Sequence, residues 1–259
     1  MHLEREGSLD RVQPEFRPVV AAARQEIPRR FPGGRLHSAY VYGSIPRGAT
    51  RPGRSDLDLM LALRQEPTPA DREAARELED VLDAAHPQID GAGVLLFGVA
   101  TLLSDLERYD LGWFTACLCT PLLGPDLGAE LPRYRPTSLL ARETNGDLHL
   151  VLPRWEERLR AGVTTALARD VGRRLTRTGM ALVLPRHGRW TSDLLSQAAI
   201  FGDYYSDRAR LMARAAALGL DPVPDRAEVS VLLRDLAPWL VGEYLRRHGV
   251  KAVPTATET

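Results

Sequence analysis

The pattern of apolar and polar residues changes character once along the chain. In the first half, short apolar runs with the length of strands alternate with segments of helical periodicity. From about residue 139 onward, only helical periodicity is left. This change predicts an α+β chain in two parts, with a small domain of strands and helices at residues 1–148 and an all-helical domain at residues 149–259.

The first part is expected to begin with a helix and to continue with strands. Apolar residues at helical spacing occupy residues 9–31, and Pro32-Gly33-Gly34 ends that segment. Between two of the strands, residues 68–85 are expected to form a helix, because Thr68 can cap it and Pro69 suits its first turn. Strands are predicted at residues 36–42, 57–63, 89–99 and 113–123.

The second part differs from the first in charge as well as in pattern. Residues 1–150 contain 17 basic and 22 acidic side chains, whereas the rest contain 17 and 12, so the helical part carries a balance of +5. Helices are predicted there at residues 155–168, 171–183, 192–217 and 228–247.

The composition is that of an ordinary folded protein, with 44% hydrophobic and 26% charged residues among 259. No apolar run approaches the roughly 18 residues of a membrane span, and the charged N-terminal segment lacks the apolar stretch of a secretory signal. Two cysteines, Cys117 and Cys119, cannot form a disulfide framework. We therefore expect a cytoplasmic protein with no membrane partner, and its net charge of zero argues against binding nucleic acid with its whole surface.

One segment carries a candidate metal site. An apolar strand is followed by Gly43-Ser44, and the next strand opens with Asp56-Leu57-Asp58. Side chains two residues apart on a strand point to the same face, so the two carboxylates are expected to project together. Neighbouring carboxylates repel each other unless a cation lies between them, and Mg²⁺ prefers oxygen ligands of this kind. The sequence therefore predicts Mg²⁺ at Asp56 and Asp58.

The residues that surround Gly43 suit a phosphate group. A glycine lets the backbone approach a ligand closely, and Ser44 offers a hydroxyl and a backbone N–H at an expected helix start. The loop that follows contains Arg47, Arg51 and Arg54, whose guanidinium groups can take up the charge of a triphosphate. Phosphate-binding groups beside a metal site are what nucleotidyl transfer requires.

This segment resembles the signature of the minimal nucleotidyltransferase family, within the DNA polymerase β-like superfamily. That signature is an apolar strand, Gly-Ser, a variable loop and Asp-x-Asp on the next strand. Here Gly43-Ser44 is followed by eleven residues and then by Asp56-Leu57-Asp58, and Gly48 and Ser55 also fall where the family often has them. In addition, residues 173–217 look like the C-terminal helical domain of aminoglycoside adenylyltransferases.

The resemblance implies a fold and a set of binding residues. The expected fold is a small mixed nucleotidyltransferase sheet with flanking helices, followed by a helical domain that binds the acceptor. The resemblance implies that a nucleoside triphosphate, with ATP as the expected donor, lies over Gly43, Ser44, Arg47 and Ser55.

The resemblance also implies a mechanism. One or two Mg²⁺ ions would be held by Asp56 and Asp58. The family uses a third carboxylate on a following strand, which binds metal and can act as the base, and Asp90 is the candidate because it opens the third predicted strand. An acceptor hydroxyl would attack the α-phosphorus, and pyrophosphate would leave.

The acceptor stays open at this point. An aminoglycoside is favoured by the resemblance, and the helical part offers carboxylates for a polycation at Asp193, Asp203, Asp207 and Glu243. The +5 balance of that part suits RNA better, so a tRNA- or protein-directed nucleotidyltransferase of the toxin or regulatory kind is the alternative. A non-catalytic nucleotide-binding module is a further alternative from a different class.

Overall fold

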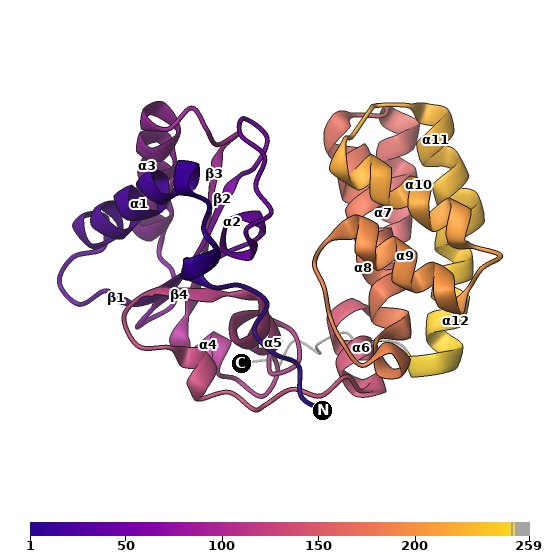
Figure 1. Ribbon diagram of the computed structural model, residues 1–259, viewed down its shortest axis with the longest axis horizontal. Coiled ribbons are helices and arrows are strands. Elements are labelled where there is room, and N and C mark those ends of the chain that lie inside the picture. The colour runs from indigo at the N-terminus through magenta and orange to yellow at the C-terminus, as the bar shows by residue number, and fades with distance from the viewer. Residues whose placement is uncertain (250, 252–259) are drawn as a thin grey trace. The chain divides into compact units, whose positions relative to one another are not determined.

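The computed structural model describes residues 1–249 and residue 251. Their contacts divide the chain into two compact units, Glu4–Arg133 and a second unit made of Met1–Leu3 with the residues from Tyr134 onward. The change of unit at Arg133 lies earlier in the chain than the boundary expected at residue 148. The sheet unit is drawn mainly in indigo to magenta and the helical unit mainly in rose to yellow (Figure 1).

In the described part of the chain, four strands form one mixed sheet in the order β3-β2-β1-β4. Strand β1 pairs antiparallel with β2 and with β4, whereas β2 pairs parallel with β3. This arrangement confirms the α+β class with a small mixed sheet. The strands are β1 (Leu36–Tyr42), β2 (Leu57–Leu63), β3 (Ala92–Gly98) and β4 (Thr120–Leu123).

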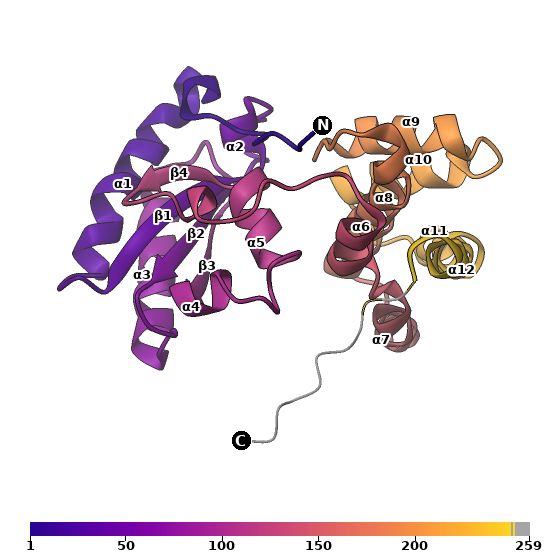
Figure 2. The ribbon, with the colours of Figure 1, turned by 90° about the horizontal axis from the view of Figure 1, so that it is seen from below.

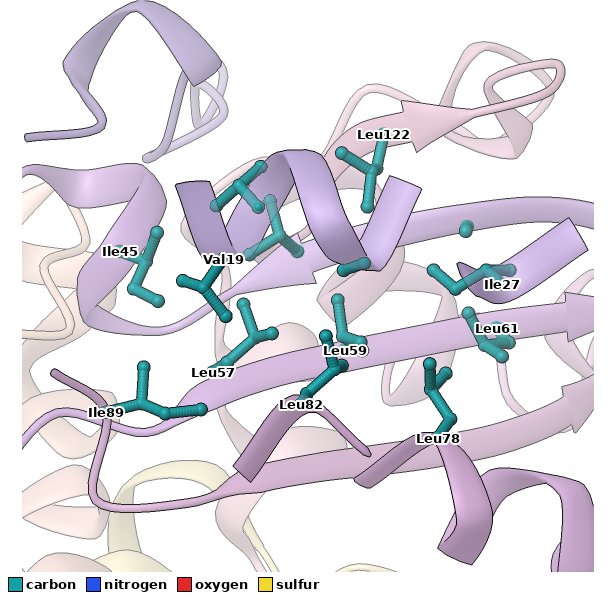
Figure 3. Close-up of a cluster of buried hydrophobic side chains, with 14 of the residues drawn as sticks. Val19, Ile27, Ile45, Leu57, Leu59, Leu61, Leu78, Leu82, Ile89 and Leu122 are labelled. Atoms are coloured by element: carbon teal, nitrogen blue, oxygen red, sulfur yellow. The ribbon is translucent and has the colours of Figure 1, made fainter. Parts of the chain in front are cut away.

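One face of the sheet is covered by the helices α1 (Arg17–Arg30) and α3 (Pro69–Ala85). Every second residue of β2, namely Leu57, Leu59 and Leu61, is fully buried against them. Figure 3 shows these leucines between apolar side chains of α1, such as Val19 and Ile27, and apolar side chains of α3, such as Leu78 and Leu82. At roughly 1.5–3 kcal/mol for each fully buried side chain of this size, this face contributes much of the stability of the unit.

The opposite face of the sheet carries a second apolar cluster, which includes Tyr40, Met60 and Ala62. Short helical elements cover it, and Figure 2 shows α4 and α5 on the side of the sheet away from α1. These elements are α4 (Val99–Leu102), α5 (Leu111–Trp113), the π-helical turn η3 (Phe114–Leu118) and the 3-10 turn η4 (Leu127–Ala129). No helix in the described residues is long and apolar enough to cross a membrane.

The element boundaries differ from the expected ones where proline or a tight turn intervenes. The predicted helix at residues 9–31 is interrupted, because the 3-10 turns η1 (Leu9–Arg11) and η2 (Pro14–Phe16) precede α1. The predicted strand at residues 113–123 is wrong over most of its length, since only residues 119–123 are extended and residues 113–118 are helical.

The second unit contains only helical elements among its described residues. Helix α8 runs through it and is buried along most of its length. Breaks at Gly162 and at residues 205–208 divide the chain differently from the predicted segments. The helices are α6 (Ser138–Asn145), α7 (Leu148–Ala161), α8 (Thr165–His187), α9 (Leu194–Tyr204), α10 (Ala209–Leu220), α11 (Arg226–Val231) and α12 (Ala237–His248), with the π-helical turn η5 (Leu232–Leu236) between the last two.

Helices α8 and α10 approach closely where each carries a glycine. A Cβ on Gly172 would lie 2.6 Å from the carbonyl oxygen of Ala215 and nearer still to the amide nitrogen of Gly219. These atoms belong to the backbone of α10, so a side chain at residue 172 has no flexible neighbour to displace. The pair of glycines therefore sets the distance between the two helices.

We expect Gly172→Ala to destabilise the helical unit by about 1–3 kcal/mol, because the two backbones must move apart. Gly242→Ala is the matched control, since Gly242 is exposed on α12 and a Cβ there meets nothing within 4 Å. The control is expected to be neutral or slightly stabilising. Urea unfolding followed by circular dichroism measures both, and equal effects of the two substitutions would contradict this account of the helix packing.

In the sheet unit, Asp71 ties the start of α3 to the start of β1. Its carboxylate accepts hydrogen bonds from the Thr68 backbone N–H at 2.7 Å and from the Arg35 guanidinium at 2.6 and 2.9 Å. In return, the Thr68 hydroxyl accepts the Asp71 N–H, so the Thr68 cap predicted from the sequence is part of a capping box. The hydrogen bonds from Arg35 are the main reason that the pKa of Asp71 lies well below its usual range.

The lowered pKa of Asp71 predicts a loss of stability in acid. The contacts require the carboxylate, so their contribution is complete above the ordinary aspartate pKa of about 3.9 and disappears as the pH falls through the lower pKa of the folded protein. We expect Asp71→Asn to cost about 2 kcal/mol at pH 7 and progressively less below about pH 4. Urea unfolding across this pH range is the measurement. Asp80→Asn, an exposed carboxylate on the same helix, should change little at any pH.

Candidate active site

The candidate site lies where β1 ends and β2 begins. Because these strands are antiparallel, the end of one is next to the start of the other, and Tyr42 pairs in register with Asp58. The chain then turns at Gly43 and enters the short helix α2 (Ser44–Arg47). The pairing therefore brings the Gly-Ser turn and the Asp-x-Asp segment together, although eleven residues separate them in the sequence.

Gly43 is required for its conformation and for its lack of a side chain. Its backbone angles are φ 80° and ψ −146°, a combination that residues with a Cβ rarely adopt. A Cβ there would also overlap the carboxylate of Asp58 and would lie 3.3 Å from its Cγ. The Asp58 carboxylate thus lies directly against the backbone at the turn.

The residues at this point fit a magnesium ion. Asp56 and Asp58 are both half-buried, and Asp56 immediately precedes the strand that contains Asp58. No group of three or more His, Cys, Asp and Glu side chains among the described residues could hold a metal. Two carboxylate ligands from the protein are nevertheless enough for Mg²⁺, because this ion usually keeps several waters and takes its remaining ligands from substrate phosphates.

The other residues predicted to bind the nucleotide lie in the turn and loop between β1 and β2. Ser44 is half-buried at the first residue of α2, and the Arg47 Nε–H donates to the carbonyl oxygen of Gly43 at 2.9 Å. Ser55 is buried, and its hydroxyl accepts the backbone N–H of Arg51 at 2.8 Å. Arg47 and Ser55 therefore hold the loop in shape, and their roles toward a nucleotide stay predictions.

Asp90 is exposed and lies in the bend before β3, since that strand begins at Ala92 and not at the predicted residue 89. Its backbone N–H donates to the carbonyl oxygen of Ser55 at 3.1 Å. The β3 residue in register with Asp58 is Gly93. The role of Asp90 as a third carboxylate stays a prediction, whereas the position of Gly93 beside Asp58 becomes visible only through the strand register.

Sequence reasoning missed a segment that supports the site from outside, which we call the N-terminal strap (residues 5–13). The Ser8 N–H donates to the carbonyl oxygen of Pro46 at 2.9 Å. The Gln13 amide donates to the carbonyl oxygen of Gly48 at 3.1 Å and also bonds the hydroxyl of Thr50. These bonds fix the loop after Ser44, and no residue type or spacing in the sequence indicates them.

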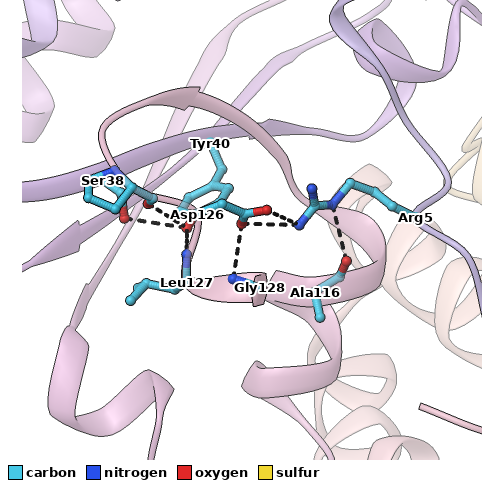
Figure 4. A network of polar contacts seen from close by, with 8 residues as sticks. Arg5, Ser38, Tyr40, Ala116, Asp126, Leu127 and Gly128 are labelled. Carbon is cyan, nitrogen blue, oxygen red and sulfur yellow. Dashed lines mark hydrogen bonds and ion pairs between the residues drawn. The ribbon is translucent and has the colours of Figure 1, made fainter. Parts of the chain in front are cut away.

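The strap is itself anchored to the rest of the sheet unit. The Arg5 guanidinium binds the Asp126 carboxylate at 2.8 and 3.1 Å (Figure 4). Next to it, the hydroxyl of Tyr40 accepts the Leu127 N–H at 2.7 Å. Since Tyr40 lies on β1 and is fully buried, this network connects the strap to the sheet near the site.

Three of the carboxylates considered for a cationic acceptor have partners within the helical unit, including Asp207, which pairs with Arg208 at 3.4 Å. Glu243 is buried, accepts the Tyr205 hydroxyl at 2.7 Å and pairs with Arg247 at 2.9 Å. Asp193 caps α9 by accepting the Ser196 N–H at 2.8 Å. Asp203 and Asp207 are exposed.

The cysteines are core residues and not candidate nucleophiles. Both are buried free thiols, and burial raises the pKa of Cys117 to about 12 and that of Cys119 well above its usual value. At neutral pH neither forms the thiolate that nucleophilic chemistry requires.

No protein-family model and no curated protein matches the sequence. The structure is similar to spectinomycin adenyltransferase AAD(9) from Enterococcus faecialis, solved with ATP and spectinomycin. The TM-score is 0.52 at 10% identity, and the similarity covers 86% of this chain and 98% of that one. This chain has a nucleotidyltransferase fold. The comparison confirms the resemblance that the Gly-Ser and Asp-x-Asp segments suggest, and at this identity it extends to the fold alone.

Within this nucleotidyltransferase fold, we expect Gly43→Ala to disturb the site as well as the stability of the sheet unit. Gly53→Ala is the matched control, because Gly53 also has a positive φ (68°) but a Cβ there meets nothing within 4 Å. Both substitutions should cost roughly 1–2 kcal/mol through backbone strain. Only Gly43→Ala should weaken binding of Mn²⁺, used as a probe for Mg²⁺, by about tenfold, since it displaces Asp58. Titration calorimetry compares them, and unchanged binding in Gly43→Ala would refute the inferred contact.

Proposed function

We propose that this protein is a magnesium-dependent nucleotidyltransferase, which moves a nucleoside monophosphate from a nucleoside triphosphate to an acceptor hydroxyl. The observation that carries the proposal is the contact between the Gly43 turn and the Asp58 carboxylate at the junction of β1 and β2. It puts a backbone suited to phosphate beside a pair of carboxylates suited to a divalent cation. The nucleotidyltransferase fold supports the same reaction class.

The proposed roles follow from chemistry and position. Asp56 and Asp58 would hold one or two Mg²⁺ ions, which neutralise phosphate charge when bound. The Gly43-Ser44 backbone and the Ser44 hydroxyl would position the phosphates, and the exposed guanidinium groups of Arg51 and Arg54 lie in the loop between the two segments. Asp90 is the general base that the family resemblance predicts.

We propose ATP as the donor and a small hydroxyl-bearing molecule of the aminoglycoside type as the acceptor. The support is that the structurally similar adenyltransferase was solved with ATP and spectinomycin. A non-catalytic nucleotide-binding module would bind the nucleotide and release no pyrophosphate, so pyrophosphate release separates the two functions.

The experiment measures pyrophosphate released from ATP, GTP, CTP or UTP with Mg²⁺, in the presence of an aminoglycoside and aminocyclitol panel or of bulk tRNA. We expect release with ATP and one of the small acceptors. Release only with tRNA would move the acceptor to RNA, and nucleotide binding without release under every condition would favour the binding module.

We expect Asp58→Asn to reduce this release by more than about 100-fold while the fold stays intact. Loss of a group that only orients a metal ligand already lowers metal affinity or activity by about 10–100-fold. Asp105→Asn is the control, since the Asp105 side chain is 87% exposed in the same unit and is expected to leave the rate unchanged. Wild-type turnover by Asp58→Asn would remove the proposed mechanism.

A further inference from the structure

The parallel pairing of β2 with β3 decides which residue of β3 lies beside the metal carboxylates. In this register Leu57 pairs with Ala92, Asp58 with Gly93 and Leu59 with Val94. Register partners share a face of the sheet, so the β3 residue next to Asp58 on its own face is Gly93. A glycine there supplies no carboxylate.

The space above Gly93 is open within the sheet unit. A Cβ on this residue would meet no atom within 4 Å, and its φ lies outside the range that favours glycine. Neither backbone conformation nor crowding therefore requires a glycine. Leu95, the next β3 residue on the same face, is 39% exposed, which marks this part of the face as uncovered within its unit.

Asp90 is poorly placed to substitute for a carboxylate at residue 93. It comes three residues earlier, in the bend before β3, and its side chain is exposed. Its N–H donates to the carbonyl oxygen of Ser55, and the next carbonyl, that of Gly91, accepts the Leu57 N–H at 2.8 Å. The backbone around Asp90 is therefore fixed to Ser55 and to the first residue of β2. No group of three acidic, histidine or cysteine side chains that could bind a metal occurs within the described ranges.

We propose that this site has two metal-binding carboxylates and not three, and that Gly93 leaves the place beside Asp58 free for substrate. The inference rests on the proposed function and makes it specific. Two carboxylates are enough for Mg²⁺ when phosphates and water complete its ligands. The strand β3 then provides no general base, and Asp90 is not a catalytic residue.

The absence of a carboxylate on β3 determines where the proton of the acceptor hydroxyl goes during the reaction. The acceptor oxygen forms a bond to the α-phosphorus, the bond from that phosphorus to the bridging oxygen of the β-phosphate breaks, and pyrophosphate leaves with the electron pair. The proton of the acceptor hydroxyl passes to solvent water, because no carboxylate of β3 stands beside Asp58 to accept it.

Binding of Mn²⁺ to the full chain, measured by titration calorimetry and electron paramagnetic resonance, tests the inference without relying on turnover. Gly93→Asp adds a third carboxylate in register with Asp58 and should tighten Mn²⁺ binding by about tenfold or more. Leu95→Asp adds the same charge two residues further along the same face and should change the affinity by less than about twofold. Asp90→Asn should also change it by less than about twofold. Thermal unfolding of each variant checks its fold, and Gly93→Glu replaces Gly93→Asp if the latter does not fold.

A tenfold or greater loss of Mn²⁺ affinity in Asp90→Asn would overturn the inference, and so would an unchanged affinity in the folded residue-93 variants. The same measurements test the proposed function separately from the two-carboxylate site. If Mn²⁺ affinity responds to residue 93 while the wild-type protein releases no pyrophosphate, the two-carboxylate site stands and the transferase proposal fails. If release depends on Asp58 and Asp90→Asn abolishes both release and Mn²⁺ binding, the transferase stands and the two-carboxylate site fails.

Discussion

The approach of the Asp58 carboxylate to the backbone of Gly43 is the constraint on which the candidate site depends. It exists because β1 and β2 are antiparallel, so that Tyr42 and Asp58 pair at the end of the ladder. It is allowed because residue 43 has no Cβ and adopts a φ of 80°. Under the proposed function, a phosphate bound at this turn would be repelled by the Asp58 carboxylate unless a cation lay between them. The proposal therefore links nucleotide binding to metal binding.

The rest of the sheet unit keeps this contact in place. Leu57, Leu59 and Leu61 of β2 are buried against α1 and α3. Because side chains alternate along a strand, Asp58 then lies on the opposite face of the sheet. From outside, the N-terminal strap bonds the loop after Ser44 through Ser8 and Gln13, and Arg5 anchors the strap to Asp126. The backbone of the loop is therefore held largely by residues that play no part in the proposed chemistry.

Much of this organisation could be predicted from the sequence, because local signals were strong. The ranges of β1 and β2 follow from short apolar runs, and the Thr68 cap and the Gly-Ser to Asp-x-Asp arrangement follow from residue type and spacing. What could not be predicted depends on long-range pairing. The register that puts Gly93 beside Asp58 arises from contacts between strands, and Gly91-Ala92-Gly93 has no feature that marks it. Residues 113–118 are apolar enough for a strand but form helical turns, since they cover one face of the sheet and are not part of it.

The position of a bound metal is the most direct test of the candidate site. A crystal of this protein grown with Mn²⁺ and a non-hydrolysable ATP analogue would locate the ion by anomalous scattering. We predict a Mn²⁺ peak between the carboxylates of Asp56 and Asp58, with the triphosphate lying against Gly43-Ser44. A nucleotide bound elsewhere, or a Mn²⁺ peak away from both carboxylates, would contradict it.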